Sequence, residues 1–236
     1  MAAMKKKWDE RAESWIRWSR TPDHDHYYWR FARPALLALL PEPGTLTLDI
    51  GCGEGRLARE LTELGHHVVG VEASPMLAAA AREATPPTEV VIADAASMPL
   101  PDAEADLAIA CMSLMNFDDL GAVLSEIGRV LTPNGCFCFV TVHPLRSIRS
   151  ARSALGEVRY FDELRYAVID ERAGLRMEFH DSHRPLSALH SGIEDAGLVL
   201  ETLREPVPDD SYVADHPEVQ KCRDDPFLLL GRAVKP

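Results

Sequence analysis

The sequence has few features of a secreted or membrane-bound protein. Its five cysteines are an odd number without regular spacing, which argues against a disulfide framework and favours a reducing compartment. Apolar runs are short, and a run such as 35–40 could not cross a bilayer. Residues 1–18 contain lysines but no apolar segment of the kind that a secretory signal needs. We therefore predict a cytoplasmic protein with no membrane partner.

Basic residues are also scarce. The chain has 25 Lys and Arg against 37 Asp and Glu, a formal net charge of -12. Such a charge repels phosphate backbones and anionic lipid surfaces, so we expect no nucleic-acid partner and favour a small-molecule one. With 236 residues, of which 46% are hydrophobic, the chain can bury one substantial core.

The N-terminal part predicts helices. Trp8, Ala12, Trp15 and Ile16 share one face of an expected helix over 5–18, and a second helix is expected over 28–40. We treat 1–43 as a helical cap on a domain spanning 44–236. The aromatic residues of this cap either pack on the domain or form a lid over a ligand.

From residue 45 onward, strands and helices alternate, which predicts an α/β fold with a doubly wound parallel sheet. Residues 144–184 interrupt this rhythm as an insertion with a hairpin near 171–174, expected to form an acceptor lid or an oligomer contact, for example in a homodimer. Residues 205–226 are rich in Pro and Asp and predict a loop. The expected strands are 45–50, 67–72, 89–93, 106–112, 136–143, 198–204 and 227–234, and the expected helices of this part are 56–64, one starting at 74–75, 118–131 and 186–196.

The segment Leu48–Leu57 is the most informative part of the chain. A short apolar strand containing Asp49 leads into three alternating glycines and then a helix start. Glycines allow the backbone to approach a ligand closely, and a helix N-terminus offers free N–H groups. Nicotinamide-binding folds prefer a third glycine where this chain has Arg56. Asp49 would repel a pyrophosphate but suits an ammonium group, which favours S-adenosylmethionine over NAD.

Other strand ends carry matching signals. Glu72 follows the glycine turn by roughly 20 residues, the spacing of an acid that binds ribose hydroxyls. Asp94 ends the next strand, and Met112 lies in an apolar, sulfur-rich strand end. Each of these side chains could also be an ordinary strand-end residue, but their combination favours one adenosine-containing ligand.

These motifs resemble those of class I S-adenosylmethionine-dependent methyltransferases, in the small-molecule group that includes ubiquinone-biosynthesis-type enzymes. The resemblance implies a Rossmann-like sheet of seven strands in the order 3-2-1-4-5-7-6, with the last strand antiparallel. It covers about 44–143 well and the last helix and two strands loosely. The matching segments are Leu48–Gly55, Gly70–Leu77, Ala93–Ala95, Met98–Leu100, Glu126 and Arg129–Gly135.

The resemblance also implies roles for single residues in holding the cofactor. The turn and Asp49 would bind the methionine moiety, Glu72 the ribose, and Met112 the region of the sulfonium. Four further residues, Ala73, Ser74, Asp94 and Ala95, would contact the adenine. The turn residues are Gly51, Cys52, Gly53 and Gly55.

The acceptor side is less determined. His143 and His183 are candidates for a general base, because histidine titrates near neutral pH, although each could simply cap a turn or strand. Arg184 could orient an anionic group of the acceptor. Tyr28 could close over the cofactor and Tyr27 over the acceptor, with cation–π attraction to a cationic group.

We therefore predict methyl transfer from S-adenosylmethionine to an O or N atom of a small-molecule metabolite, for example in secondary metabolism. The alternatives are a non-catalytic cofactor binder and, less favoured, a nicotinamide-dependent oxidoreductase. No metal site is expected, because the sequence places no third ligand for the two histidines of the His24-Asp25-His26 cluster and a solvated loop explains that cluster.

Overall fold

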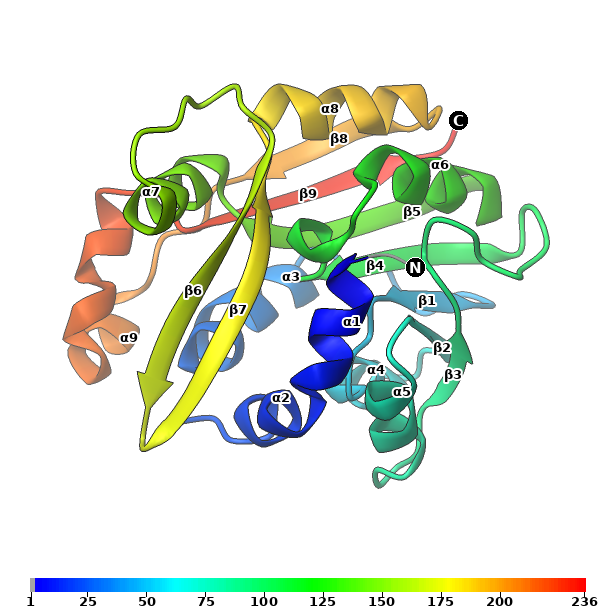
Figure 1. Cartoon of the computed structure of the whole chain (residues 1–236). Coiled ribbons are helices and arrows are strands. Elements are labelled where there is room, and N and C mark those ends of the chain that lie inside the picture. Colours follow the sequence, from blue (N-terminus) through cyan, green and yellow to red (C-terminus); the bar gives the residue numbers. More distant parts are fainter. Residues whose placement is uncertain (1–2) are drawn as a thin grey trace.

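A seven-stranded sheet forms the centre of the structure, a computed structural model that describes residues 3–236 (Figure 1). The strand order is β3-β2-β1-β4-β5-β9-β8, and β9 runs antiparallel to both of its neighbours. This confirms the predicted order and the antiparallel last strand. The strands are β1 Thr47–Ile50, β2 Val68–Glu72, β3 Glu89–Ile92, β4 Ala105–Cys111, β5 Leu131–Val142, β8 Val199–Arg204 and β9 Leu228–Val234.

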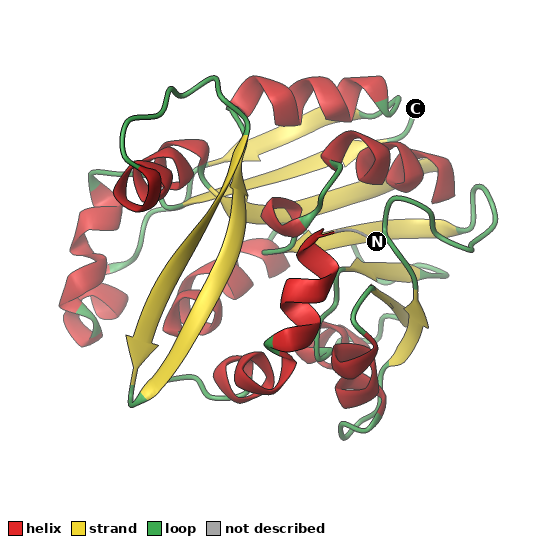
Figure 2. Cartoon of the chain, viewed as in Figure 1, coloured by secondary structure: helices red, strands yellow, loops and turns green. Residues whose placement is uncertain are grey.

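Helices cover both faces of this sheet (Figure 2). One core joins the sheet to α6 (Leu120–Val130) and α8 (Leu186–Asp195). The opposite core joins it to α3 (Arg33–Leu37) and α4 (Arg56–Glu63). Because both faces are covered, the central strands are apolar without alternation, and β1 and β2 are buried at every residue.

The helix after β2 begins where the sequence predicts. Ser74 precedes α5 (Pro75–Arg82), and its hydroxyl accepts a hydrogen bond from the Leu77 N–H at 3.3 Å. Proline at the first helical position needs no hydrogen bond there. This cap fixes the start of α5 directly after the end of β2.

The N-terminal segment differs from its prediction. The expected helix over 5–18 is divided at Arg11 into α1 (Ala3–Glu10) and α2 (Ala12–Ser19). The apolar spacing continues across the break, so periodicity could not reveal it. The second helical segment begins as one π-helical turn, Tyr28–Ala32, and ends with α3 at Leu37 instead of residue 40.

The insertion contains a helix that was not predicted, α7 (Pro144–Leu155), followed by a hairpin. The hairpin consists of β6 (Leu164–Arg172) and β7 (Leu175–His183), paired antiparallel as a separate sheet, with its turn within the predicted 171–174. In Figure 1 this hairpin crosses in front of the main sheet and its tip lies near α2.

The expected loop at 205–226 is also partly helical. It contains α9 (Asp210–Asp215) and a 3₁₀ segment, Pro217–Arg223. The carboxylate of Asp209 caps α9 by accepting the Tyr212 N–H at 2.7 Å. Both elements are too short for a periodic signal.

No helix within residues 3–236 has the length and apolarity needed to cross a membrane.

Candidate functional site

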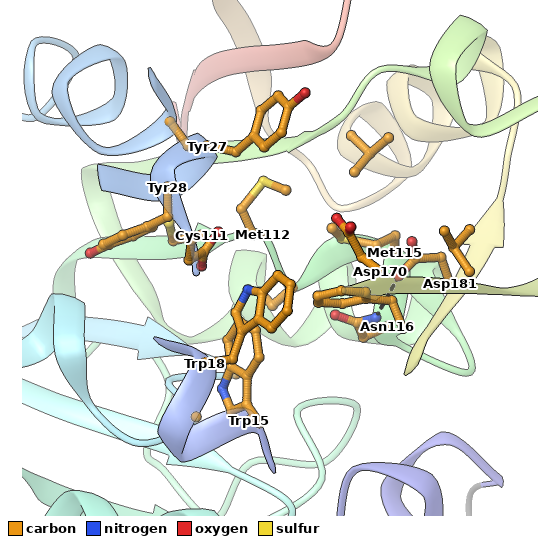
Figure 3. Close-up of a pocket in the computed structure, with 18 of the residues that line it drawn as sticks. Trp15, Trp18, Tyr27, Tyr28, Cys111, Met112, Met115, Asn116, Asp170 and Asp181 are labelled. Carbon is orange, nitrogen blue, oxygen red and sulfur yellow. Dashed lines mark hydrogen bonds between the residues drawn. The ribbon is translucent and has the colours of Figure 1, made fainter. Parts of the chain in front are cut away.

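A cavity of about 630 Å³ lies at the carboxyl ends of β1, β2 and β4. The N-terminal segment and the β6–β7 hairpin complete its walls, so that residues far apart in the sequence face one space (Figure 3). Its position agrees with the general rule that open α/β sheets bind ligands beyond the carboxyl ends of their strands. The cavity contains both apolar aromatic surface and buried charged groups.

The glycine turn forms the floor of this cavity. Gly51 has φ +73°, and a Cβ there would lie 2.8 Å from the Ser113 Cβ. Gly53 has φ +59°, and a Cβ there would lie 3.2 Å from Nε1 of Trp15. Both positions combine a left-handed backbone with close neighbours, so a side chain would be strained and crowded. The turn therefore presents bare backbone under the indole of Trp15.

Asp49 supplies a buried carboxylate beside this turn. It is 2% exposed, and its Oδ2 has no hydrogen-bond partner among the described residues. Burial, with a smaller contribution from the charge of Glu72, raises the pKa of Asp49 from 3.8 to about 7. A buried acceptor without a partner is unfavourable. This carboxylate is therefore suited to a ligand that brings a cation or a hydrogen-bond donor.

Glu72 is held in place by the backbone around it. Its carboxylate accepts the Gly53 N–H at 2.9 Å and the Ser74 N–H at 2.7 Å. Burial raises the pKa of Glu72, and these backbone hydrogen bonds oppose the rise. The side chain joins the end of β2 to the glycine turn and lines the cavity.

The wall near β4 combines an aromatic ring with a buried cation. The Arg56 guanidinium lies 3.4 Å from the centroid of the Tyr28 ring and donates to Asp25 at 2.6 Å. Burial raises the pKa of Tyr28 well above its usual value, and its hydroxyl has no described hydrogen-bond partner. Tyr28 therefore presents a neutral, buried phenol to the cavity.

The hairpin contributes charged groups to the opposite wall. Asp181 accepts a hydrogen bond from the Asn116 side-chain amide at 3.2 Å, drawn as a dashed line in Figure 3. Burial raises the pKa of Asp181 to about 6. Asp170 also lines this wall and forms an ion pair with Arg172. Asp181 is therefore a partly buried carboxylate on the hairpin side of the cavity.

Tyr27 forms a further aromatic part of the wall. Its ring stacks on Phe227 with the centroids 4.5 Å apart, and the Arg172 guanidinium lies 4.9 Å from its centroid. Burial raises the pKa of Tyr27 to about 12, so the phenol is neutral at physiological pH. In Figure 3, Tyr27 and Trp15 lie at opposite ends of the drawn site with Met112 between them.

Eight of the sequence-predicted residues come together in the cavity lining. Five predicted cofactor residues are outside it, at the neighbouring strand ends and in the turn. Asp94 is exposed, and its Oδ1 accepts the Ala96 N–H at 3.0 Å. The cofactor and acceptor roles of both sets stay predictions. The lining set is Tyr27, Tyr28, Asp49, Gly51, Cys52, Gly53, Glu72 and Met112, and the outside set is Gly55, Ala73, Ser74, Asp94 and Ala95.

The two candidate bases are not part of the cavity lining. His143 caps α7: its Nδ1 accepts the Leu145 N–H at 3.1 Å, and its Nε2 lies 2.8 Å from a Glu205 oxygen. His183 is fully buried, with Ser147 Oγ 2.6 Å from Nδ1 and Tyr160 O 2.8 Å from Nε2. Both ring nitrogens of each histidine thus have partners within the protein. The capping interpretation describes His143, whereas His183 is a buried ring that bridges Ser147 and Tyr160. A catalytic role for either histidine stays a prediction.

Arg184 also lies outside the cavity lining. Its guanidinium donates to the Phe117 carbonyl at 2.7 Å and to the Leu114 carbonyl at 3.4 Å. These contacts join the end of the hairpin to the segment after β4. Its proposed contact with an acceptor stays a prediction.

Sequence reasoning expected the insertion to form an acceptor lid or an oligomer contact, but it named none of the hairpin residues that line the cavity. The lining residues of β6 are Tyr166, Val168 and Asp170 at alternate positions, with Ile169 between the last two, and those of β7 include Phe179 and Asp181. This period of two is the normal signature of a strand with one face toward a ligand or core. It could have been found once the hairpin was placed against the strand ends.

Comparisons with known proteins agree with this geometry. Residues 48–139 match a family described as "Methyltransferase domain". A solved S-adenosylmethionine-dependent methyltransferase from Mesorhizobium loti is 28% identical, with a TM-score of 0.70, over 85% of this chain and 96% of that one. Part of the chain thus matches a methyltransferase family, and most of it is similar in sequence and fold to a solved S-adenosylmethionine-dependent methyltransferase.

Two curated methyltransferases illustrate the range of relatives. The nocamycin O-methyltransferase of Saccharothrix syringae is 36% identical over 55% of this chain and 50% of its own length. The malonyl-[acyl-carrier protein] O-methyltransferase of Enterobacter lignolyticus (strain SCF1) is 31% identical over 64% of this chain and 62% of its own. The chain thus spans less than two thirds of the curated relatives that it matches.

The residues that line the cavity fit S-adenosylmethionine, the cofactor of the similar solved methyltransferase. The unpartnered carboxylate of Asp49 suits the ammonium of its methionine moiety. The bare backbone of Gly51 and Gly53 permits a close approach. Glu72 is fixed at the end of β2 and lines the cavity, where an acid can accept from ribose hydroxyls.

Proposed function

We propose that this chain transfers a methyl group from S-adenosylmethionine to an O or N atom of a small molecule bound in the same cavity. The unpartnered Asp49 carboxylate at the glycine turn is the observation that carries the proposal. When bound, the cofactor supplies an electrophilic methyl group on a sulfonium. Asp49 holds its ammonium end, and Glu72 holds its ribose.

The N-terminal cap has the role of excluding water. The π-helical turn and α2 place Tyr28, Trp15 and Trp18 along the cavity. The faces of these aromatic rings provide an apolar and electron-rich boundary, which attracts the cationic sulfonium of the cofactor without neutralising its charge. Methyl transfer from a sulfonium is an in-line displacement by the acceptor atom. The main contribution that this reaction needs from the protein is to hold both reactants in one enclosed space.

The hairpin wall has the role of holding the acceptor. Tyr166 of β6, together with Tyr27 of the neighbouring N-terminal segment, offers aromatic surface, which favours an acceptor with a planar or apolar part. Asp181 faces the same space and, once ionised, can accept the proton that an O–H or N–H acceptor loses. Asn116 holds the Asp181 carboxylate in one orientation through its amide.

The test combines binding with turnover. Calorimetry should show that S-adenosylmethionine and S-adenosylhomocysteine bind to the wild-type chain and NAD does not. Formation of S-adenosylhomocysteine is then followed with a panel of phenols, carboxylic acids and amines. Binding without product from any acceptor would favour a non-catalytic binder, and binding of NAD alone would contradict the proposal.

A further inference from the structure

One arginine in the wall of the cavity has no polar partner. Arg146 of α7 is partly buried and lines the cavity, but its guanidinium forms no hydrogen bond or ion pair within the part of the chain that the structure describes. The lining contains two other arginines, and both are neutralised. Arg56 pairs with Asp25, and Arg172 pairs with Asp170. A guanidinium has five N–H donors, so the free side chain of Arg146 suits a ligand that brings acceptor oxygens.

The helix that carries Arg146 turns one face toward the cavity. Ser150 follows Arg146 by about one turn, and both residues line the cavity. Arg146 lies in the first turn of α7, which contains no acidic residue. Because the N-terminal end of a helix has a partial positive charge, a cation there is unfavourable and an anion is favourable. A bound anion would therefore offset both the charge of Arg146 and that of the helix end.

Aromatic rings lie between Arg146 and the Asp181 carboxylate. The Arg146 Cζ lies 5.5 Å from the centroid of the Phe227 ring, which stacks on Tyr27. Tyr166 of β6 is the direct cross-strand partner of Asp181 on β7. Burial raises the pKa of Tyr166, the charge of Asp181 adds to this rise, and the charge of Arg146 opposes it. The Tyr166 side chain is thus within electrostatic reach of both charged groups, so a ligand beside its ring can meet Asp181 at one end and Arg146 at the other.

The other charged groups near this wall do not neutralise Arg146. Glu218 is exposed, and its Oε1 lies 3.4 Å from His26 Nε2 and 3.5 Å from His216 Nδ1. Lys221 belongs to the same 3₁₀ segment, is also exposed, and lines the cavity. The 3₁₀ segment therefore adds one negative and one positive side chain to the lining, and the charge of Arg146 remains unmatched.

We propose that the methyl acceptor is an aromatic carboxylic acid whose carboxylate binds Arg146 while its hydroxyl or amino group faces Asp181. The inference rests on the proposed methyl transfer and names the class of its acceptor. The planar fork of one guanidinium matches the two oxygens of one carboxylate. The carboxylate is the anchor and not the methylated group, because Asp181 repels an anion and accepts a proton that only an O–H or N–H group supplies. The new O–C or N–C bond forms as the C–S bond of the cofactor breaks, and the acceptor proton passes to Asp181.

The first test measures binding to the full chain in the presence of S-adenosylhomocysteine, so that it requires no methyl transfer. The probes are hydroxybenzoates, aminobenzoates and hydroxycinnamates, each compared by calorimetry with its primary amide, which has nearly the same shape and no charge. The acid that binds most tightly should bind about 10–150-fold more tightly than its amide. Arg146→Gln should remove this preference and leave the affinities for the amide and for S-adenosylhomocysteine unchanged. Arg146→Lys retains the charge without the planar fork and should retain part of the preference.

Arg149 provides the matched control, because it carries the same charge on the exposed side of the same helix, where it pairs with Asp225. Arg149→Gln should leave the preference for acids unchanged. Equal binding of every acid and its amide by the wild type, or an unchanged preference in Arg146→Gln, would overturn the proposal.

The second test follows methyl transfer from S-adenosylmethionine to the same probes and separates this inference from the proposed function. Transfer to an acid that is at least about 10-fold faster than transfer to its amide at low probe concentration, with the difference lost in Arg146→Gln, would support both. Equal transfer to acids and amides would overturn the carboxylate anchor and leave the methyl transfer intact. Binding of acids through Arg146 without any transfer would support the anchor and contradict the methyl transfer.

Discussion

Replacing Asp49 with asparagine should stabilise the ligand-free chain and weaken cofactor binding at the same time. The pKa of Asp49 rises from 3.8 to about 7 on folding, chiefly through burial. At 1.36 kcal/mol per pKa unit, this corresponds to a cost of up to about 4 kcal/mol for keeping the ionised carboxylate in the folded chain. Asparagine has nearly the same shape and carries no charge.

The sign of the pH dependence follows from proton binding. Between about pH 4 and pH 7 the folded state binds more protons at Asp49 than the unfolded state does. This contribution therefore lowers the free energy of unfolding as the pH rises through that window. Asp49→Asn removes it, so the variant should exceed the wild type in stability by up to about 4 kcal/mol at about pH 8 and by little at about pH 4.

Urea unfolding of the ligand-free chain at both pH values measures this difference, and calorimetry with S-adenosylhomocysteine measures the loss of binding. A hydrogen bond to a charged group contributes about 1.5–3 kcal/mol, so the affinity should fall by roughly 10–150-fold. Asp195→Asn, at an exposed residue of α8, is the matched control and should change neither quantity. Wild-type affinity in Asp49→Asn, or a gain in stability that is equal at both pH values, would refute the reasoning.

Three further substitutions test other parts of the site. Gly51→Ala places a Cβ 2.8 Å from Ser113 at a φ of +73°, so the melting temperature should fall by roughly 3–8 °C in a thermal scan, and an unchanged value would contradict the crowding. Asp181→Asn should lower turnover of an O–H or N–H acceptor by about 10²–10⁴-fold while S-adenosylhomocysteine affinity stays unchanged. Because the pKa of Asp181 is raised to about 6, turnover by the wild type should also rise as the pH increases through that value. His183→Ala removes the contacts of a fully buried ring with Ser147 and Tyr160, so the free energy of unfolding should fall by about 2–3 kcal/mol. Unchanged stability with lost turnover would instead support the catalytic prediction for His183.

The sheet was predictable because its signals are local. Asp49 and the glycines after it, Ser74 at the start of α5 and the regular apolar strands each depend on a few neighbouring residues. A parallel sheet with covered faces produces these signals repeatedly along the chain. The same local patterns predict that Asp49 and Glu72 face one ligand, and both side chains line the same cavity.

The acceptor side was less predictable because it depends on contacts between distant segments. His143 and His183 attract attention as titratable side chains near strand ends, but contacts with Glu205, Ser147 and Tyr160 hold them outside the cavity lining. Asp181 enters the cavity only because the hairpin crosses the strand ends.

The helical pieces of 205–226 were missed for the same reason. Tyr212 is buried against Phe31 and His26 of the N-terminal segment. His26 is separated from Tyr212 by 186 positions in the sequence. Short elements stabilised by such contacts leave no periodic pattern in the sequence.

The central claim is that the cavity brings a methyl donor and a small-molecule acceptor together. The most direct measurement incubates the wild-type chain with S-adenosylmethionine that carries an isotope-labelled methyl group and a panel of hydroxyl and amine acceptors, and follows the label by mass spectrometry. We predict that the label appears on an O or N atom of a small molecule, with one S-adenosylhomocysteine formed for each methyl transferred and a large loss in Asp49→Asn. Saturating cofactor binding with no transfer of the label to any acceptor would contradict the claim.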